Sequence, residues 1–248
     1  MAVRRLGTLG LSEQLRSFVA DAPLERRPIL DFVMRQAVRL PSGSRVADVG
    51  GKEAPYRELF DHCDYVTVDW ELSLHEEPKK ADAATSAYAI ARADRSFDAI
   101  VLTEVLEHVR EPADLLEELH RLLRPGGRLL VTVPFAFQLH EMPFDFFRYT
   151  RFGLEHLLGN AGFEQIEITA NSDSFTALAQ LMRNAGRIMG RAPDGLDELR
   201  DAAAAELDRL ADELLELAPL DARVVFPLGY AASAIRPEET GADDTSPR

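Results

Sequence analysis

Residues 97–134 read FDAIVLTEVLEHVREPADLLEELHRLLRPGGRLLVTVP. The segment begins with an apolar run over 97–103, which is typical of a buried strand. Pro112 then opens a predicted helix with leucines at helical spacing, and the Pro-Gly-Gly of 125–127 closes it. A second apolar run follows over 128–133. Strand, helix and strand in this order predict a right-handed βαβ unit in a mostly parallel sheet, so the fold class is α/β.

The same alternation continues toward the N-terminus. Residues 45–49 (RVADV) and 65–69 (YVTVD) predict two more strands, with a short helix between them over 55–60. Residues 12–40 predict a helical entry, with Pro28 at a first-turn position. The chain is therefore expected to continue as helices alternating with strands of one sheet.

The C-terminal third has a different pattern. Leucines step by three and four over 196–217, which predicts an amphipathic helix with an acidic outer face. This face is either the solvated side of a packed helix or a surface for a partner or lid. Residues 223–235 predict a last strand, and Pro227 indicates an edge strand or a bulge. The polar tail over 236–248 is expected to be disordered.

These patterns divide the chain into four segments. The segment 171–193 is rich in apolar residues, including methionines, and is either a lid over a site or part of the core. The four expected segments are an N-terminal helical segment (1–40), a cofactor-binding core (41–170), a helical lid or insertion with the last strand (171–235) and a disordered acidic tail (236–248).

Composition narrows the class of protein. The 248 residues carry 28 Lys+Arg against 42 Asp+Glu, a net charge of −14. This charge argues against nucleic-acid capture and against docking on an anionic membrane. The single cysteine, Cys63, makes no intrachain disulfide, and no apolar run is long enough for a signal peptide or a membrane span. We expect a soluble cytoplasmic protein, a monomer or homodimer, that acts on a small molecule.

Chemistry is expected at the carboxyl ends of the strands, where ligands bind on open parallel sheets. The first strand ends in Asp48-Val-Gly-Gly51, whose small residues let a ligand approach the backbone N–H groups. The second ends at Asp69, 19 residues after Gly50, where an acid accepts hydrogen bonds from ribose hydroxyls. The third strand runs into Thr103-Glu-Val-Leu-Glu-His108. Together these strand ends predict a site for a nucleoside-containing cofactor.

Two phosphate-binding motifs are excluded. A P-loop would need Gly at position 46 and Ser or Thr at 53, where the chain has Val46 and Glu53. A GxGxxG motif starting at Gly50 fails because Lys52 and Pro55 occupy its other glycine positions. Glu53 would also repel a pyrophosphate at the helix start. The predicted cofactor therefore lacks phosphates.

With these strand ends, the chain resembles a class I S-adenosylmethionine-dependent methyltransferase of the small-molecule type. The resemblance covers residues 40–170 and rests on VADVGGKEAPYRELF, YVTVDW, ADAATSA, SFDAIVLTEVLEHVREP and LLRPGGRLLVTVP in that order. The stretch HEMPFDFFRYTRFGLEHLLGNAGFE resembles a segment of bacterial family members from glycan and secondary-metabolite pathways. The resemblance implies a Rossmann-like sheet of seven mostly parallel strands with helices on both faces and helical additions at both ends. It also implies S-adenosyl-L-methionine as the cofactor.

The resemblance assigns cofactor-binding roles to residues of the first two strand ends. Gly50 and Gly51 would contact the amino-acid end of the cofactor, and Asp48 would order their loop. Asp69 would bind the ribose hydroxyls, with Trp70 beside the adenine. The alternatives are that Asp69 only completes a strand-end turn and that Trp70 packs in the core.

Four further cofactor residues follow from the resemblance. Asp82 would face the adenine amino group, with Ala83 as its backbone neighbour, although Asp82 could also be a structural acid. Thr103 and Glu104 would line the floor beneath the sulfonium. These residues complete the predicted cofactor pocket.

The glycine loop departs from the family pattern. The family has a second glycine where this chain has Lys52, and a small residue or glycine at Ala54. A Cβ there could require an unfavourable backbone angle. Either Lys52 pairs with the carboxylate of the cofactor, or the loop belongs to a degraded pocket. A degraded pocket would make the protein a non-catalytic scaffold, and a third possibility is an enzyme that uses the cofactor without methyl transfer.

A hydroxyl or ammonium acceptor must lose a proton during methyl transfer, so the site needs a base. His140 is our first candidate because its loop is expected to overhang the methyl group, and His108 is the second. Alternatively, His108 packs beneath the cofactor and His140 is a plain loop residue. No metal is expected, because HEMPF at 140–144 does not match the HExxH zinc motif.

An aromatic segment follows the fourth strand. Phe144, Phe147 and Tyr149, together with Glu141, are candidates for the wall of a substrate pocket. The other interpretation is that the aromatic residues anchor the following helix. Arg148 is expected to hold a carboxylate or phosphate of the substrate, or to pair with a neighbouring acid.

Overall fold

The computed structural model describes residues 10–51, 54–70, 83–85, 90–189, 197–221 and 224–238. Its strands are β1 (Arg45–Val49), β2 (Asp64–Trp70), β3 (Ala83–Thr85), β4 (Phe97–Thr103), β5 (Leu123–Pro134), β6 (Glu164–Ala170) and β7 (Gly229–Ile235). They form one seven-stranded sheet in the order β3-β2-β1-β4-β5-β7-β6. The first five strands in this order, from β3 through β2, β1 and β4 to β5, run parallel. Strand β7 is antiparallel to both β5 and β6. The predicted mostly parallel α/β sheet is confirmed.

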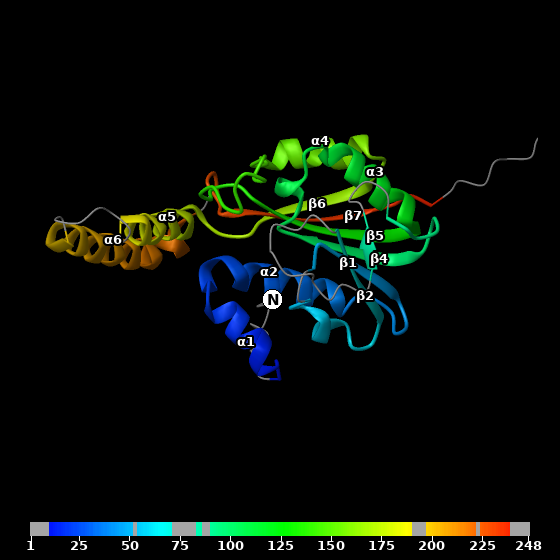
Figure 1. Cartoon of the computed structure of the whole chain (residues 1–248), viewed down its shortest axis with the longest axis horizontal. Coiled ribbons are helices and arrows are strands. Elements are labelled where there is room, and N and C mark those ends of the chain that lie inside the picture. Colours follow the sequence, from blue (N-terminus) through cyan, green and yellow to red (C-terminus); the bar gives the residue numbers. More distant parts are fainter. Residues whose placement is uncertain are drawn as a thin grey trace, which may run out of the picture.

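Helices cover both faces of this sheet. The described α-helices are α1 (Glu13–Ala20), α2 (Pro23–Ala37), α3 (Pro112–Leu122), α4 (Arg151–Asn160), α5 (Ser174–Met189) and α6 (Asp197–Leu217). Three 3-10 turns add η1 (Arg57–Phe60), η2 (Leu106–His108) and η3 (Ala218–Leu220). In Figure 1, α3 and α4 lie on one face of the sheet and α1 and α2 on the other, while α5 and α6 extend beyond its edge.

Alternation along the strands builds two cores. In β4, Ile100 and Leu102 join the core beneath α3 and α4, whereas Ala99 and Val101 join the core with α2. This follows from the period of two in a strand, which sends successive side chains to opposite faces. The leucines at the end of α3 and the start of β5 are fully buried: Leu115, Leu116, Leu119, Leu122 and Leu123.

The N-terminal helical region consists of two helices rather than one. Helix α1 ends at Ala20 and α2 begins at Pro23, which interrupts the predicted run over 12–40. The prediction for Pro28 is wrong, because Pro23 occupies the first turn and Pro28 lies inside α2. Proline lacks an N–H, so Pro28 removes one helical hydrogen bond without ending the helix. The helix predicted over 55–60 is reduced to the short turn η1.

Two strands differ from the sequence prediction. Strand β5 begins at Leu123 rather than at residue 128, and its pairing with β4 shifts register between Phe97 and Ala99. The Pro-Gly-Gly segment therefore lies within β5. The prediction of an edge strand or bulge at Pro227 is also wrong, because β7 starts at Gly229 and pairs on both sides. Pro227 precedes the strand, so its missing N–H costs no ladder hydrogen bond.

The C-terminal part supports the predicted amphipathic helix. Helix α6 packs against α5, and Arg183 and Asp212 form an ion pair at 2.5 Å between them. The leucine face is only partly covered, since Leu199 is 68% exposed. Arg236 donates hydrogen bonds to three backbone carbonyls, so the start of the tail is anchored, while residues 239–248 lie outside the described residues. Within the described part of the chain, no helix combines the length and apolarity that membrane crossing needs.

Candidate functional site

A cavity of about 1350 Å³ opens at the carboxyl ends of β1, β4 and β5. Helices α1 and α2, the loop after β1, and the loops after β4 and β5 surround it. Ligands bind at this edge of open parallel sheets because the strand ends leave a crevice there. Of the residues selected from the sequence, those that border the cavity are Asp48, Gly50, Gly51, Thr103, Glu104, His108, His140 and Glu141.

The glycine loop after β1 is built for a close backbone approach. Gly50 has a φ of +73°, a conformation that glycine adopts without steric cost. A Cβ on Gly51 would collide with the carboxylate of Asp48. Ala54 also has a positive φ, of +51°, which is the backbone angle that the departure from the family pattern predicted. Lys52 lies outside the described residues, so both interpretations of it stay open.

Asp48 places a buried carboxyl group at the cavity. The hydroxyl of Tyr65 donates a hydrogen bond to its Oδ2, whereas Oδ1 has no hydrogen-bond partner among the residues that the structure describes. Burial raises the pKa of Asp48 to about 6, and the nearby charge of Asp69 adds to this effect. A cationic group of a ligand would therefore find an available acceptor at this position.

The predicted adenosine-binding residues are only partly described. Asp69 is buried at the end of β2, next to the strand end that leads to Gly50, but it does not border the cavity. Ala83 begins β3 and pairs with Val68 of β2. The side chain of Trp70 and all of Asp82 lie outside the described residues. Their roles stay predictions.

Glu104 follows β4 with a strained backbone. Its φ is +52°, which is uncommon for a residue with a Cβ. Its side chain is half-buried, and desolvation raises the pKa of Glu104 to about 7. Strained backbone conformations and perturbed carboxyl groups both concentrate at functional sites. Glu104 and Thr103 border the cavity at the end of β4, and their place beneath the sulfonium stays a prediction.

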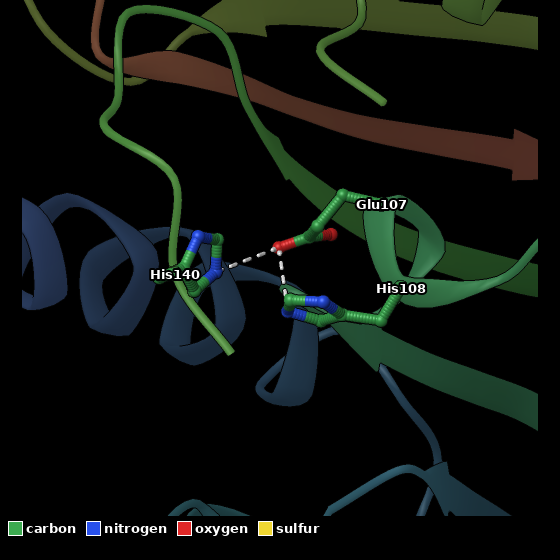
Figure 2. A group of neighbouring side chains, drawn as sticks. All are labelled: Glu107, His108 and His140. Atoms are coloured by element: carbon green, nitrogen blue, oxygen red, sulfur yellow. Dashed lines mark ion pairs between the residues drawn. The ribbon is translucent and has the colours of Figure 1, made fainter. Parts of the chain in front are cut away.

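Beside Glu104, three side chains from two segments converge (Figure 2). Glu107 and His108 belong to η2, and His140 lies in the loop after β5. Glu107 Oε1 is 3.6 Å from Nε2 of His108 and 3.8 Å from Nε2 of His140. The two imidazole rings are 4.7 Å apart between centroids. Burial raises the pKa of Glu107 well above its usual value and lowers the pKa of His140.

The loop that carries His140 is held by an ion pair. Arg148 Nη1 is 2.6 Å from Oδ1 of Asp145, and Arg148 also donates to the backbone carbonyls of Phe137 and Gln138. The Asp145 carboxylate in turn accepts a hydrogen bond of 2.8 Å from the backbone N–H of His140. Arg148 is thus engaged with its neighbouring acid, which was the structural alternative for this residue.

The aromatic segment lies outside the cavity wall. Tyr149 is buried in the core and its hydroxyl donates a hydrogen bond to the carbonyl of Leu106. Phe144 and Phe147 are partly exposed, at 36% and 37%, and neither borders the cavity. Their role as a wall of the substrate pocket and their role as an anchor for the following helix both stay predictions. Five described residues were predicted to contact the substrate, and of these Glu141 alone borders the cavity.

Residues 20–187 match the protein family described as methyltransferase domain. This chain belongs to that family. Membership confirms the class of S-adenosylmethionine-dependent methyltransferases and its cofactor, S-adenosylmethionine. The class I Rossmann-like fold is also that of an S-adenosylmethionine-dependent methyltransferase from Archaeoglobus fulgidus, with a TM-score of 0.54 at 15% identity over 89% of this chain and 98% of that one.

Two curated relatives of this methyltransferase come from quinone pathways. Demethylmenaquinone methyltransferase of Renibacterium salmoninarum is 34% identical over 43% of this chain and 46% of its own length. Ubiquinone biosynthesis O-methyltransferase of Xylella fastidiosa is 46% identical over 42% of this chain and 46% of its own length. The chain therefore spans about half the length of these relatives.

The cavity of this methyltransferase fits its cofactor. S-adenosylmethionine carries a sulfonium and an ammonium. The cavity offers Glu104 and the Oδ1 of Asp48, which has no hydrogen-bond partner among the described residues. Because Gly51 has no Cβ, it leaves room for the Asp48 carboxylate. A buried acceptor without a donor is costly unless a ligand supplies one. The residues present therefore suit a ligand with a cationic amino-acid end.

Two residues of this site were missed from the sequence. Glu107 directly precedes His108 in the same segment, and this adjacency was the available signal. Asp145 lies among the aromatic residues, where the sequence indicates it only as the neighbouring acid that Arg148 can pair with. Neither relation to His140 is visible in the sequence. The contact with Glu107 joins the segment after β4 to the loop after β5, and the contact with Asp145 depends on how the loop after β5 folds on itself.

Proposed function

We propose that this protein transfers a methyl group from S-adenosylmethionine to an oxygen or nitrogen atom of a small metabolite. The observation that supports the proposal is one shared cavity. Asp48, Gly50 and Gly51 border it on the cofactor side, and His108 and His140 border it where an acceptor would enter. A methyltransferase needs this alignment more than it needs covalent help from the protein, because the reaction is an in-line displacement.

The cofactor would be held by residues of the strand ends. S-adenosylmethionine supplies an electrophilic methyl group on its sulfonium. We propose that Asp48 and the backbone of Gly50 and Gly51 bind the amino-acid end. Asp69 would accept hydrogen bonds from the ribose hydroxyls, as carboxylates do after the second strand of related nucleoside-binding folds. We further propose that Trp70, Asp82 and Ala83 border the adenine.

The proton of the acceptor would pass to the histidine cluster. Burial lowers the pKa of His140, so its ring is neutral at pH 7 and free to accept a proton. Asp145 lies 3.2 Å from Nδ1 of His140 and would stabilise the charged ring that results. His140 is therefore the proposed general base, with His108 beside it. Glu141, at the same rim, is the proposed contact for a polar group of the substrate.

The acceptor class is a small, hydroxylated metabolite. We propose a sugar or natural-product intermediate, and the names of the quinone-pathway relatives add phenolic hydroxyls to the first set of candidates. A net charge of −14 disfavours nucleic acid as the substrate and anionic lipid as a partner. The proposed setting is the cytoplasm, with the protein as a monomer or homodimer.

Cofactor binding is the first test. Calorimetric titration of the full-length protein with S-adenosylmethionine and S-adenosylhomocysteine is expected to give micromolar binding that weakens in Asp69→Ala. Asp98→Ala is the matched control, because Asp98 lies at the opposite end of its strand and pairs with Arg124. The absence of binding for both ligands would contradict the proposal and favour a scaffold role.

Product analysis separates the enzymatic alternatives. The protein is incubated with S-adenosylmethionine and a panel of phenols, sugars and amines, and products are measured by mass spectrometry. We expect S-adenosylhomocysteine and methylated acceptor in equal amounts. Conversion of an acceptor without consumption of S-adenosylmethionine would identify a non-methylating enzyme instead.

A further inference from the structure

The ligand atoms of Glu107, His108 and His140 form a compact group. One ligand atom from each side chain lies within 4.8 Å of the others. The oxygen–nitrogen distances from Glu107 are 3.6 and 3.8 Å, and Figure 2 shows both rings turned toward the same carboxylate oxygen. Ligands of a tetrahedral ion at about 2.1 Å stand roughly 3.4 Å apart, so these two distances exceed the tetrahedral spacing by a few tenths of an ångström.

The outer nitrogen of each ring is already occupied. His108 Nδ1 is 2.7 Å from the carbonyl oxygen of Phe144, which fixes the hydrogen on Nδ1. His140 Nδ1 is 3.2 Å from Oδ2 of Asp145 and 3.4 Å from Nη2 of Arg148, so the carboxylate is the nearer group. A ring that donates through Nδ1 presents a lone pair at Nε2. Metal-binding histidines are oriented in this way by carboxylates and carbonyls behind them.

The environment of Glu107 would favour a bound cation. Its side chain is completely buried, and neither carboxylate oxygen has a hydrogen-bond partner among the described residues. Its backbone carbonyl accepts hydrogen bonds from the N–H groups of Phe146 and Phe147, which hold the two loops together. A buried carboxylate is costly unless it is hydrogen-bonded, paired or bound to a metal. The nearest candidates for pairing are the two Nε2 atoms described above.

We propose that Glu107, His108 and His140 bind one divalent transition-metal ion, of the class of Zn²⁺, Co²⁺ or Mn²⁺. Two imidazoles and one carboxylate suit these ions better than Mg²⁺ or Ca²⁺, which prefer oxygen ligands. The absence of an HExxH motif does not oppose this site, because its ligands come from separate loops. Glu141, whose Oε2 is 3.9 Å from Nε2 of His108, lies beside these three ligands and leaves a fourth position for the acceptor.

The ion would act on the acceptor, and this role rests on the proposed methyl transfer. His108 and His140 both border the cavity, so an open coordination position would face the substrate. A hydroxyl bound there has a lower pKa and releases its proton to water. The oxygen then attacks the methyl carbon, the S–C bond breaks, and its electron pair stays on sulfur as S-adenosylhomocysteine. In the metal-loaded protein His140 is therefore a ligand, and the ion takes over the activation assigned to the base.

Metal binding is tested on the untagged, chelator-stripped full-length protein. Co²⁺ is titrated with detection by visible d–d absorption, and Zn²⁺ is then added to displace it. We expect one equivalent of Co²⁺ to bind with spectra of a nitrogen- and oxygen-ligated ion. Glu107→Gln should abolish stoichiometric binding, and Asp145→Asn should weaken it roughly 10- to 100-fold through the orientation of His140.

The control is His156→Ala, since His156 lies on α4 and its Nε2 contacts Asn160. It should bind Co²⁺ like the wild type. Circular dichroism identifies any variant that has not folded, and Asp145→Asn provides a second variant if Glu107→Gln fails. Unchanged binding in a folded Glu107→Gln, or no binding by the wild type, would overturn the metal site. Calorimetry with S-adenosylhomocysteine on the same stripped sample reports on the proposed function separately.

Discussion

Tyr65 of β2 donates its hydroxyl hydrogen to the carboxylate of Asp48 on the neighbouring strand β1, and both side chains are buried. The bond joins the two strands whose ends carry the predicted cofactor residues. Burial raises the pKa of Asp48 to about 6, although the hydrogen bond from Tyr65 opposes this shift. The pair therefore sets both the charge at the cavity and the position of the glycine loop.

Removal of the Tyr65 hydroxyl should destabilise the protein most at alkaline pH. A buried carboxylate that loses a donor costs about 1–3 kcal/mol. The folded-state pKa of Asp48, about 6, lies above its ordinary value of 3.8, so this group disfavours folding increasingly as the pH rises between those values. Tyr65→Phe raises the folded pKa further. Urea unfolding should show a larger loss at pH 8 than at pH 5, and an equal loss at both would contradict the assignment.

Cofactor affinity should depend on the ionisation of Asp48. Above pH 6 the carboxylate is charged and attracts the cationic end of S-adenosylmethionine, whereas at pH 5 it is mostly neutral. Calorimetric affinity is therefore expected to rise through pH 6. Asp48→Asn should bind more weakly at pH 8 and lose this pH dependence. A wild-type affinity that stays constant from pH 5 to pH 8 would exclude contact between Asp48 and the cationic group.

Loss of the Arg148 side chain should loosen the loop that carries His140. Arg148 binds Asp145 through two nitrogens and donates to three backbone carbonyls, so Arg148→Ala leaves several partly buried acceptors without donors. We expect a loss of about 1–3 kcal/mol in unfolding free energy, since partly buried acceptors lose their charged donor. Arg110→Ala is the control, because Arg110 only stacks on Phe146 of the same loop. Similar losses in both variants would argue against the role of the ion pair.

The fold was largely predictable because its signals are local. Buried parallel strands are short apolar runs, and β1 and β4 begin and end at the residues that their runs indicated. The errors at Pro28 and Pro227 have another origin. The consequence of a proline depends on which neighbours its missing N–H would have met, and those neighbours belong to a helix register and to a strand pairing that the sequence does not display.

The site was predictable where strand ends meet, and not where loops meet. Asp48, Glu104 and the glycines lie at or just after the carboxyl ends of strands that share one edge, so the topology alone brings them together. The convergence of Glu107 with His140 depends on how two loops fold over that edge, and no periodic pattern encodes such a contact. The histidines were found by residue type, whereas the buried glutamate between them required coordinates.

The last prediction concerns the space beside Asp48. A Cβ on Gly51 would collide with the Asp48 carboxylate, which cannot move away freely because Tyr65 holds it. Gly51→Ala should therefore cost about 1–3 kcal/mol of unfolding free energy, as overpacking does. It should also weaken S-adenosylhomocysteine binding at least tenfold. Gly159→Ala is the matched control. Apart from its chain neighbours and its own helix backbone, no atom of the described residues lies within 4 Å of its added Cβ, and the helix α4 gains up to about 1 kcal/mol from alanine. If chemical denaturation and calorimetry find Gly51→Ala as stable and as tightly binding as Gly159→Ala, the glycine loop does not form the cofactor contact proposed for it.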